Sequence, residues 1–152
     1  MGVIIAKSVN EACDVLAENP ATTVLAGGTD LMVQVNRGAK SLESVLDLSR
    51  ILELKKWFIE GSEIVLGAGI SYTDLTNPQL AKLVPALAQA ARTVGSPQIR
   101  NAGTLGGNLA TASPAGDTIP ALVAMDAFLK LKSSTETREV SMTEFVTGVK
   151  TN

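Results

Sequence analysis

The sequence contains no histidine and a single cysteine, Cys13, among its 152 residues. The absence of histidine excludes a Ser-His-Asp triad, a Cys-His dyad and any His-ligated metal centre. One cysteine excludes an internal disulfide, a multi-thiolate zinc site and an iron–sulfur cluster held by this chain. We therefore expect the chemistry to come from a bound cofactor. Cys13 lies in an apolar helical stripe, which predicts a small buried hydrophobe rather than a reactive thiol.

Aromatic residues and basic charge are also scarce. Aromatics make up 3% of the chain and the net charge is −2, which argues against base stacking and phosphate-backbone binding and hence against a nucleic-acid partner. No apolar run approaches the roughly 18 residues of a membrane span, and the N-terminus lacks the pattern of a signal peptide. We expect a cytoplasmic protein without a membrane span. A hydrophobic content of 45% is enough for a folded core.

Strand-like and helix-like segments alternate in both orders, which predicts an α+β fold with two small lobes, about residues 1–52 and 53–152. Ser8, Ser71 and Ser141 each precede an acidic residue by three positions, the spacing of a helix capping box. Residues 95–117 show little periodicity and are predicted to be irregular and functional. The expected strands are residues 3–5, 22–26, 44–48, 55–59, 63–67, 127–132 and 137–140. Helices are expected to begin near residues 8, 71 and 141, and two further helices are expected over 80–94 and 118–125. Residues 31–35 are expected to be helical or extended.

A first glycine loop follows a predicted buried strand, in the segment Val24-Leu25-Ala26-Gly27-Gly28-Thr29-Asp30-Leu31. Glycines allow a ligand close to the backbone and tolerate positive φ. Successive backbone N–H groups in such a turn can form an anion-binding concavity, suited to a phosphate or pyrophosphate. The segment matches neither the Walker loop nor the spaced-glycine dinucleotide motif. By itself, it is compatible with an ordinary turn.

A second glycine loop, Gly103-Thr104-Leu105-Gly106-Gly107-Asn108, continues to Thr111, Ser113 and Asp117. Hydroxyl and amide groups surround its paired glycines, and the Asp117 carboxylate could accept from sugar or ribityl hydroxyls. Alternatively, the polar groups satisfy their own turns and Asp117 caps the following helix. Arg92 and Arg100 flank this loop and could offset phosphate charge or lie on the surface.

Together, the segments 26–31 and 103–117 resemble the FAD-binding subunit of molybdenum hydroxylases, the family of the flavin domains of xanthine dehydrogenase and of carbon monoxide dehydrogenase (its medium subunit). The resemblance covers nearly the whole chain. It implies a two-lobed FAD-binding domain of the vanillyl-alcohol-oxidase (PCMH) type with FAD between the lobes. The residues it assigns to FAD binding are Val24, Leu25, Ala26, Gly27, Gly28, Thr29, Asp30, Leu31, Thr104, Leu105, Gly106, Gly107, Asn108, Thr111 and Asp117.

The resemblance also implies a role in electron transfer. Substrate would be hydroxylated at a molybdopterin-binding large subunit, and electrons would pass through an iron–sulfur subunit to FAD and then to NAD or another acceptor. No side chain need act as a general base, so we assign no catalytic residue. Family subunits continue into a further C-terminal domain, which is absent from these residues, so we expect this chain to be part of a longer subunit.

Two other interpretations remain at this point. One is an assembly domain of such a complex that has lost FAD, which the retained glycines and Asp117 argue against. The other is a phosphate- or nucleotide-binding regulatory module that uses only the first glycine loop and leaves the second unexplained. Flavin absorbance distinguishes both from an FAD-binding domain.

Overall fold

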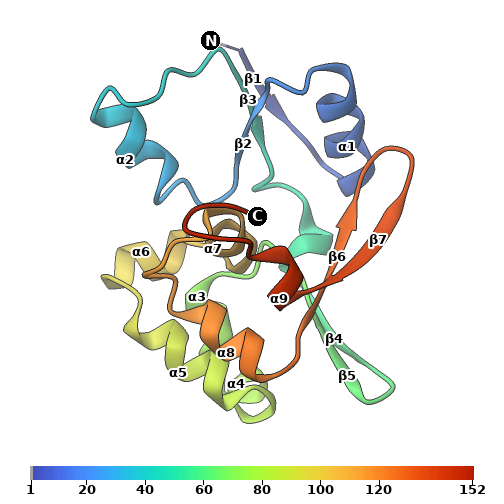
Figure 1. Ribbon diagram of the computed structural model, residues 1–152, viewed down its shortest axis with the longest axis vertical. Coiled ribbons are helices and arrows are strands. Elements are labelled where there is room, and N and C mark those ends of the chain that lie inside the picture. Colours follow the sequence, from blue (N-terminus) through green and yellow to red (C-terminus); the bar gives the residue numbers. More distant parts are fainter. Residues whose placement is uncertain (1) are drawn as a thin grey trace.

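The computed structural model describes residues 2–152 and has a mixed helix and sheet architecture (Figure 1). Near the N-terminus, β1 (Gly2–Ile5), β2 (Thr23–Leu25) and β3 (Ser44–Asp47) form a parallel sheet in the order β1-β3-β2. Helix α1 (Val9–Glu18) connects β1 to β2, and α2 (Leu31–Asn36) lies between β2 and β3. Because parallel strands need crossover connections, these helices allow β1 and β2 to flank β3.

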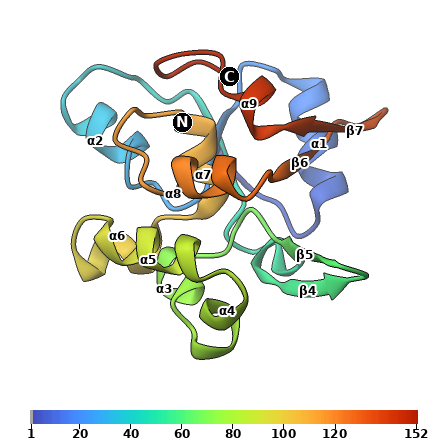
Figure 2. The same ribbon diagram turned by 60° about the horizontal axis from the view of Figure 1, so that its bottom comes forward.

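The remainder of the chain is mostly short helices between two antiparallel hairpins (Figures 1 and 2). A 3₁₀ turn (Leu52–Lys55) leads into the first hairpin, whose turn carries Gly61 at φ +61°. The second hairpin runs directly into the last helix. The elements are β4 (Trp57–Glu60), β5 (Glu63–Leu66), α3 (Tyr72–Leu75), α4 (Pro78–Leu83), α5 (Pro85–Thr93), α6 (Pro97–Ala102), α7 (Leu105–Thr111), α8 (Thr118–Ala124), β6 (Phe128–Lys132), β7 (Thr137–Ser141) and α9 (Met142–Phe145).

The structure confirms the local predictions that rest on capping and alternation. The Ser8 side chain accepts from the Glu11 N–H, and both Ser71 and Ser141 form reciprocal capping boxes. Both predicted hairpins are present. Cys13 is buried, with its thiol 3.4 Å from the Lys132 carbonyl oxygen, so the interpretation of Cys13 as a buried hydrophobe is confirmed.

The prediction that residues 95–117 are irregular was wrong. This segment contains α6 and α7, and each helix begins with a hydroxyl cap, Ser96 and Thr104. The helix predicted over 80–94 is two helices, because Val84 leaves helical geometry and Pro85 starts α5. Proline suits a first helical position, where its missing N–H has no intrahelical partner.

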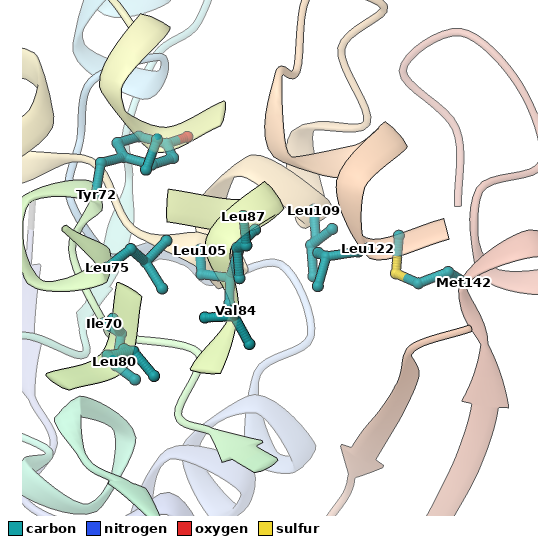
Figure 3. Close-up of a cluster of buried hydrophobic side chains, with 11 residues drawn as sticks. Ile70, Tyr72, Leu75, Leu80, Val84, Leu87, Leu105, Leu109, Leu122 and Met142 are labelled. Atoms are coloured by element: carbon teal, nitrogen blue, oxygen red, sulfur yellow. The ribbon is translucent and has the colours of Figure 1, made fainter. Parts of the chain in front are cut away.

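Buried side chains form two clusters. The smaller one joins Ala6, Ala12, Leu46 and Ile51 beneath α1. The larger one gathers side chains from β5 onward (Figure 3): Ile70, Tyr72, Leu75, Leu80, Val84, Leu87, Ala91, Leu105, Leu109, Leu122 and Met142. Burying each leucine contributes about 1.5–3 kcal/mol. The larger cluster therefore fixes α7, whose Leu105 and Leu109 point inward one turn apart.

Candidate functional site

A cleft of about 1400 Å³ lies where the two glycine loops approach each other. Its volume exceeds the range of about 300–1,000 Å³ typical of small-ligand pockets, so it suits a long ligand. Most of the lining residues come from the end of β2 and the loop after it, the start of α2, the β5–α3 connection, α3, α6 and α7. Among residues 2–152, no helix is long and apolar enough to cross a membrane, and no group of three or more acidic or thiol ligands could hold a metal.

The first glycine loop presents a row of unused backbone donors. The N–H groups of residues 26–31 donate to no acceptor within residues 2–152. Gly28 has φ +71°, the left-handed region that favours glycine and lets the chain turn from β2 into α2. Successive N–H groups in a turn that contains a left-handed residue form a concavity for anions. Because these donors line the cleft, the first loop is suited to hold a phosphate or pyrophosphate.

Gly27 is required by a contact within the protein. A Cβ atom at Gly27 would lie 1.9 Å from the Ala102 carbonyl oxygen and 3.0 Å from Gly103 Cα. The first loop therefore packs backbone to backbone against the end of α6. Ligand approach at this glycine, which the sequence predicted, stays a prediction. The structure shows in addition that the missing side chain lets the two sides of the cleft pack together.

The second glycine loop runs into the start of α7, and most of its backbone donors are already used. The N–H groups of Leu105 and Gly106 donate to the carbonyls of Ile70 and Ala68, at 2.9 Å and 2.7 Å. The Gly107 N–H donates to Thr104 Oγ1 at 3.1 Å. This side of the cleft therefore offers side chains and the bare Gly107 Cα rather than a row of free N–H groups.

The two glycines of α7 differ in what surrounds them. A Cβ at Gly106 would lie 2.6 Å from the Ala68 Cβ, so Gly106 packs against the β5–α3 connection. A Cβ at Gly107 would approach only Thr104 Oγ1, at 2.9 Å. Gly107 therefore leaves space open on the cleft side of the helix.

The structure brings most of the predicted site residues to this cleft. They are Val24, Ala26, Gly27, Gly28, Thr29, Asp30, Leu31, Thr104, Gly106, Gly107, Asn108 and Thr111. Three others lie outside its lining. Leu25 lies beneath Gly28, Leu105 is buried in the larger cluster, and the Asp117 carboxylate accepts from Thr93 Oγ1 at 3.1 Å. Contact of Asp117 with a cofactor stays a prediction.

Several lining residues carried no sequence signal of ligand binding. Ser71, Tyr72, Thr73 and Asp74 form one wall with Asn101, whose Oδ1 accepts from Thr73 Oγ1 at 2.6 Å. Lys40, Lys55 and Lys150 also line the cleft. These residues lie far apart in sequence, and only tertiary packing brings them together.

Arg100 has a structural role. Its guanidinium donates to the carbonyls of Val94 and Gly95, at 2.9 Å and 2.8 Å, and so pairs the two carbonyls that directly follow α5. Neither Arg100 nor Arg92 lines the cleft. The lysines are the basic side chains in position to meet an anionic ligand.

Tyr72 is the single tyrosine of the chain, and burial of its ring raises its pKa to about 12, with the Asp117 carboxylate adding to the shift. The folded state therefore holds the phenol proton more tightly than the unfolded state. The resulting stability is fully present below the unfolded pKa of 10.0 and is lost as the pH rises to about 12.

We expect tyrosinate absorbance to appear near pH 12 in the folded protein and near pH 10 in urea. The free energy of unfolding should fall more steeply over this interval in the wild type than in Tyr72→Phe. The two proteins share every other residue, so the difference isolates Tyr72. Equal slopes in the two proteins would contradict the assignment.

Comparison with known proteins identifies the family. The family model described as the FAD binding domain in molybdopterin dehydrogenase matches residues 1–152. The chain belongs to this family. It is thus an FAD-binding domain, and the cleft with its row of free N–H groups is the candidate place for the cofactor.

Similar proteins agree with this assignment. The chain is 41% identical to the nicotinate dehydrogenase FAD-subunit of Eubacterium barkeri, over 82% of this chain and 43% of that protein. Its fold matches carbon monoxide dehydrogenase from Hydrogenophaga pseudoflava with a TM-score of 0.93 and 32% identity, covering 98% of this chain and 53% of the other. Quinoline 2-oxidoreductase from Pseudomonas putida 86 matches with a TM-score of 0.93, 28% identity and the same coverage. The fold is therefore that of this family's FAD domains, as the sequence predicted.

The chain spans about half the length of the curated relatives it matches. The features that family membership assigns to this chain are consequently those of the FAD-binding domain.

Proposed function

We propose that this chain holds FAD in the cleft between its two glycine loops and serves in electron transfer within a molybdopterin-dependent dehydrogenase. The observation that carries the proposal is the row of unused N–H groups over residues 26–31, facing a cleft of about 1400 Å³. Residues 26–31 are only partly buried, so these N–H groups can donate to a ligand in the cleft. A pyrophosphate would supply the missing acceptors.

The residues present fit FAD. The loop of residues 26–31 would hold the pyrophosphate through N–H groups and the Thr29 hydroxyl. Among the lining side chains, Lys40, Lys55 and Lys150 outnumber Asp30 and Asp74, which favours an anionic ligand. Across the cleft, Gly107, Asn108 and Thr111 would contact the remainder of the cofactor. FAD supplies the redox chemistry when bound, and the protein contributes binding and orientation.

The proposed partners are an iron–sulfur subunit and a molybdopterin-binding large subunit, with NAD or another acceptor receiving the electrons. A cytoplasmic location stays a prediction. Support for this assembly comes from the family, whose description names molybdopterin dehydrogenases. The chain's own features contribute the absence of histidine and of a metal-ligand cluster in residues 2–152, which leaves the redox chemistry to cofactors.

A flavin-loading experiment tests this function. We expect the purified full-length protein to carry or take up FAD, seen as the visible flavin absorbance, and to bind FAD far more tightly than riboflavin. Riboflavin lacks the pyrophosphate that the first loop is suited to hold. A colourless protein that refuses added FAD would support the FAD-free assembly domain. Equal affinity for FAD and riboflavin would contradict the role of residues 26–31.

A further inference from the structure

A buried hydroxyl lies behind the cleft wall at the start of α8. Thr118 has no exposed surface, and its Oγ1 donates to Asn108 Oδ1 at 2.5 Å. Asn108 belongs to α7 and lines the cleft, whereas Thr118 does not. The two residues are ten positions apart, so the loop that joins α7 to α8 folds back to bring them together. This is the hydrogen bond that the Thr118 hydroxyl makes within residues 2–152.

The bond determines which end of the Asn108 amide remains available. Because the Thr118 hydroxyl is the donor, the amide oxygen is occupied and the amide nitrogen, Nδ2, is left. Nδ2 donates to no group within residues 2–152, and no buried side-chain polar atom in that range lacks a partner. Nδ2 is therefore accessible and can donate to a ligand.

Gly116 restricts the amide on its nitrogen side. A Cβ atom at Gly116 would lie 3.1 Å from Asn108 Nδ2 and 2.9 Å from the Ser113 carbonyl oxygen. Gly116 itself is buried. The segment 116–118 thus flanks both ends of the amide: the Thr118 hydroxyl bonds to the oxygen, and the missing side chain of Gly116 leaves space beside the nitrogen.

We propose that Thr118 is a positioning residue for FAD binding: it holds the Asn108 amide with Nδ2 available to the cleft, where it donates to an acceptor atom of the cofactor. This inference rests on the proposed function. It concerns a residue that would never touch FAD. A rotated amide would present its oxygen instead, and that oxygen would repel a phosphate or another acceptor.

The test measures the FAD dissociation constant of the full-length protein and its variants by quenching of flavin fluorescence. Thr118→Val keeps the volume and removes the hydroxyl, and Thr118→Ser keeps the hydroxyl. We expect roughly fivefold weaker binding for Thr118→Val, the factor equivalent to one hydrogen bond of about 1 kcal/mol. Thr118→Ser should bind nearly as the wild type does. Thr76→Val is the matched control, because its hydroxyl donates to the Thr73 carbonyl at 2.7 Å away from the cleft lining.

A double-mutant cycle separates positioning from a general structural effect. If Thr118 acts through the Asn108 amide, Thr118→Val should have no further effect on FAD binding in an Asn108→Ala background. An equal loss in both backgrounds would overturn the inference, as would wild-type affinity in Thr118→Val. Failure of the wild type itself to bind FAD would instead overturn the proposed function.

If Thr118→Val does not fold, the FAD dissociation constants of Thr118→Ser and Asn108→Asp are compared with that of the wild type instead. Asn108→Asp retains an acceptor for the Thr118 hydroxyl but has no N–H to donate. We expect it to fold and to lose FAD affinity by at least the same factor of five, whereas wild-type affinity in Asn108→Asp would overturn the inference.

Discussion

Replacing Gly27 by alanine is expected to separate the two sides of the cleft and to destabilise the fold. The added methyl would lie 1.9 Å from the Ala102 carbonyl oxygen, which is backbone and cannot rotate away. Overpacking a rigid contact costs about 1–3 kcal/mol and sometimes more. Because this overlap is severe, we expect the free energy of unfolding to fall by about 3 kcal/mol or more. FAD binding should be lost together with stability.

Urea denaturation followed by tryptophan fluorescence measures this effect, and Gly2→Ala is the matched control. A Cβ at Gly2 would meet nothing within 4 Å, so that variant should unfold as the wild type does. A Gly27→Ala protein with wild-type stability would mean that the first loop and α6 do not pack as the structure has them.

Replacing Gly107 by valine should also abolish FAD binding, but here the fold should be retained. Only Thr104 Oγ1 lies near a Cβ at this position, and the rest of the side chain would occupy cleft space. The added Cβ displaces the Thr104 cap, a loss of about 1 kcal/mol, and valine's better helix propensity partly offsets it, so stability should change by no more than about 1 kcal/mol. We expect FAD affinity to fall at least about a hundredfold, equivalent to about 2.7 kcal/mol.

The measurements are flavin content after purification, FAD titration and urea denaturation. Ala86→Val introduces the same side chain at an exposed position of α5 outside the cleft lining, and it should bind FAD normally. Unchanged FAD affinity in Gly107→Val would mean that FAD does not lie against α7 at this position. A variant that unfolds would show that Gly107 has a packing role.

The sequence predicted the elements whose signals are local. Ser71 and Asp74 are three positions apart and form the capping box that this spacing predicts, because both hydrogen bonds join neighbours in the chain. The strand leading to Gly27 and Gly28 was also predictable from its β-branched residues and the glycine pair. The position of the first loop in the chain therefore follows from neighbouring residues alone, whereas the cleft that it lines depends on tertiary packing.

Helix α7 could not be predicted in this way. Gly106 and Gly107 are poor helix formers, and the helix depends on tertiary contacts: the carbonyls of Ile70 and Ala68 accept its first N–H groups. Its Thr104 cap is the one local signal that could have indicated a helix start. The cleft wall at Tyr72 and Asn101 has the same tertiary origin, since only packing brings α3 beside α6.

The close contact of Gly27 with Ala102 and Gly103 has a thermodynamic consequence for the cleft. It joins main chain to main chain, so no side-chain rotamers need to be frozen when a ligand arrives. The first loop and the end of α6 are therefore already in contact before the cofactor binds. Binding then needs no free energy to bring these two sides of the cleft together. The missing methyl group of Gly27 thus lets the two sides of the cleft meet before any ligand arrives.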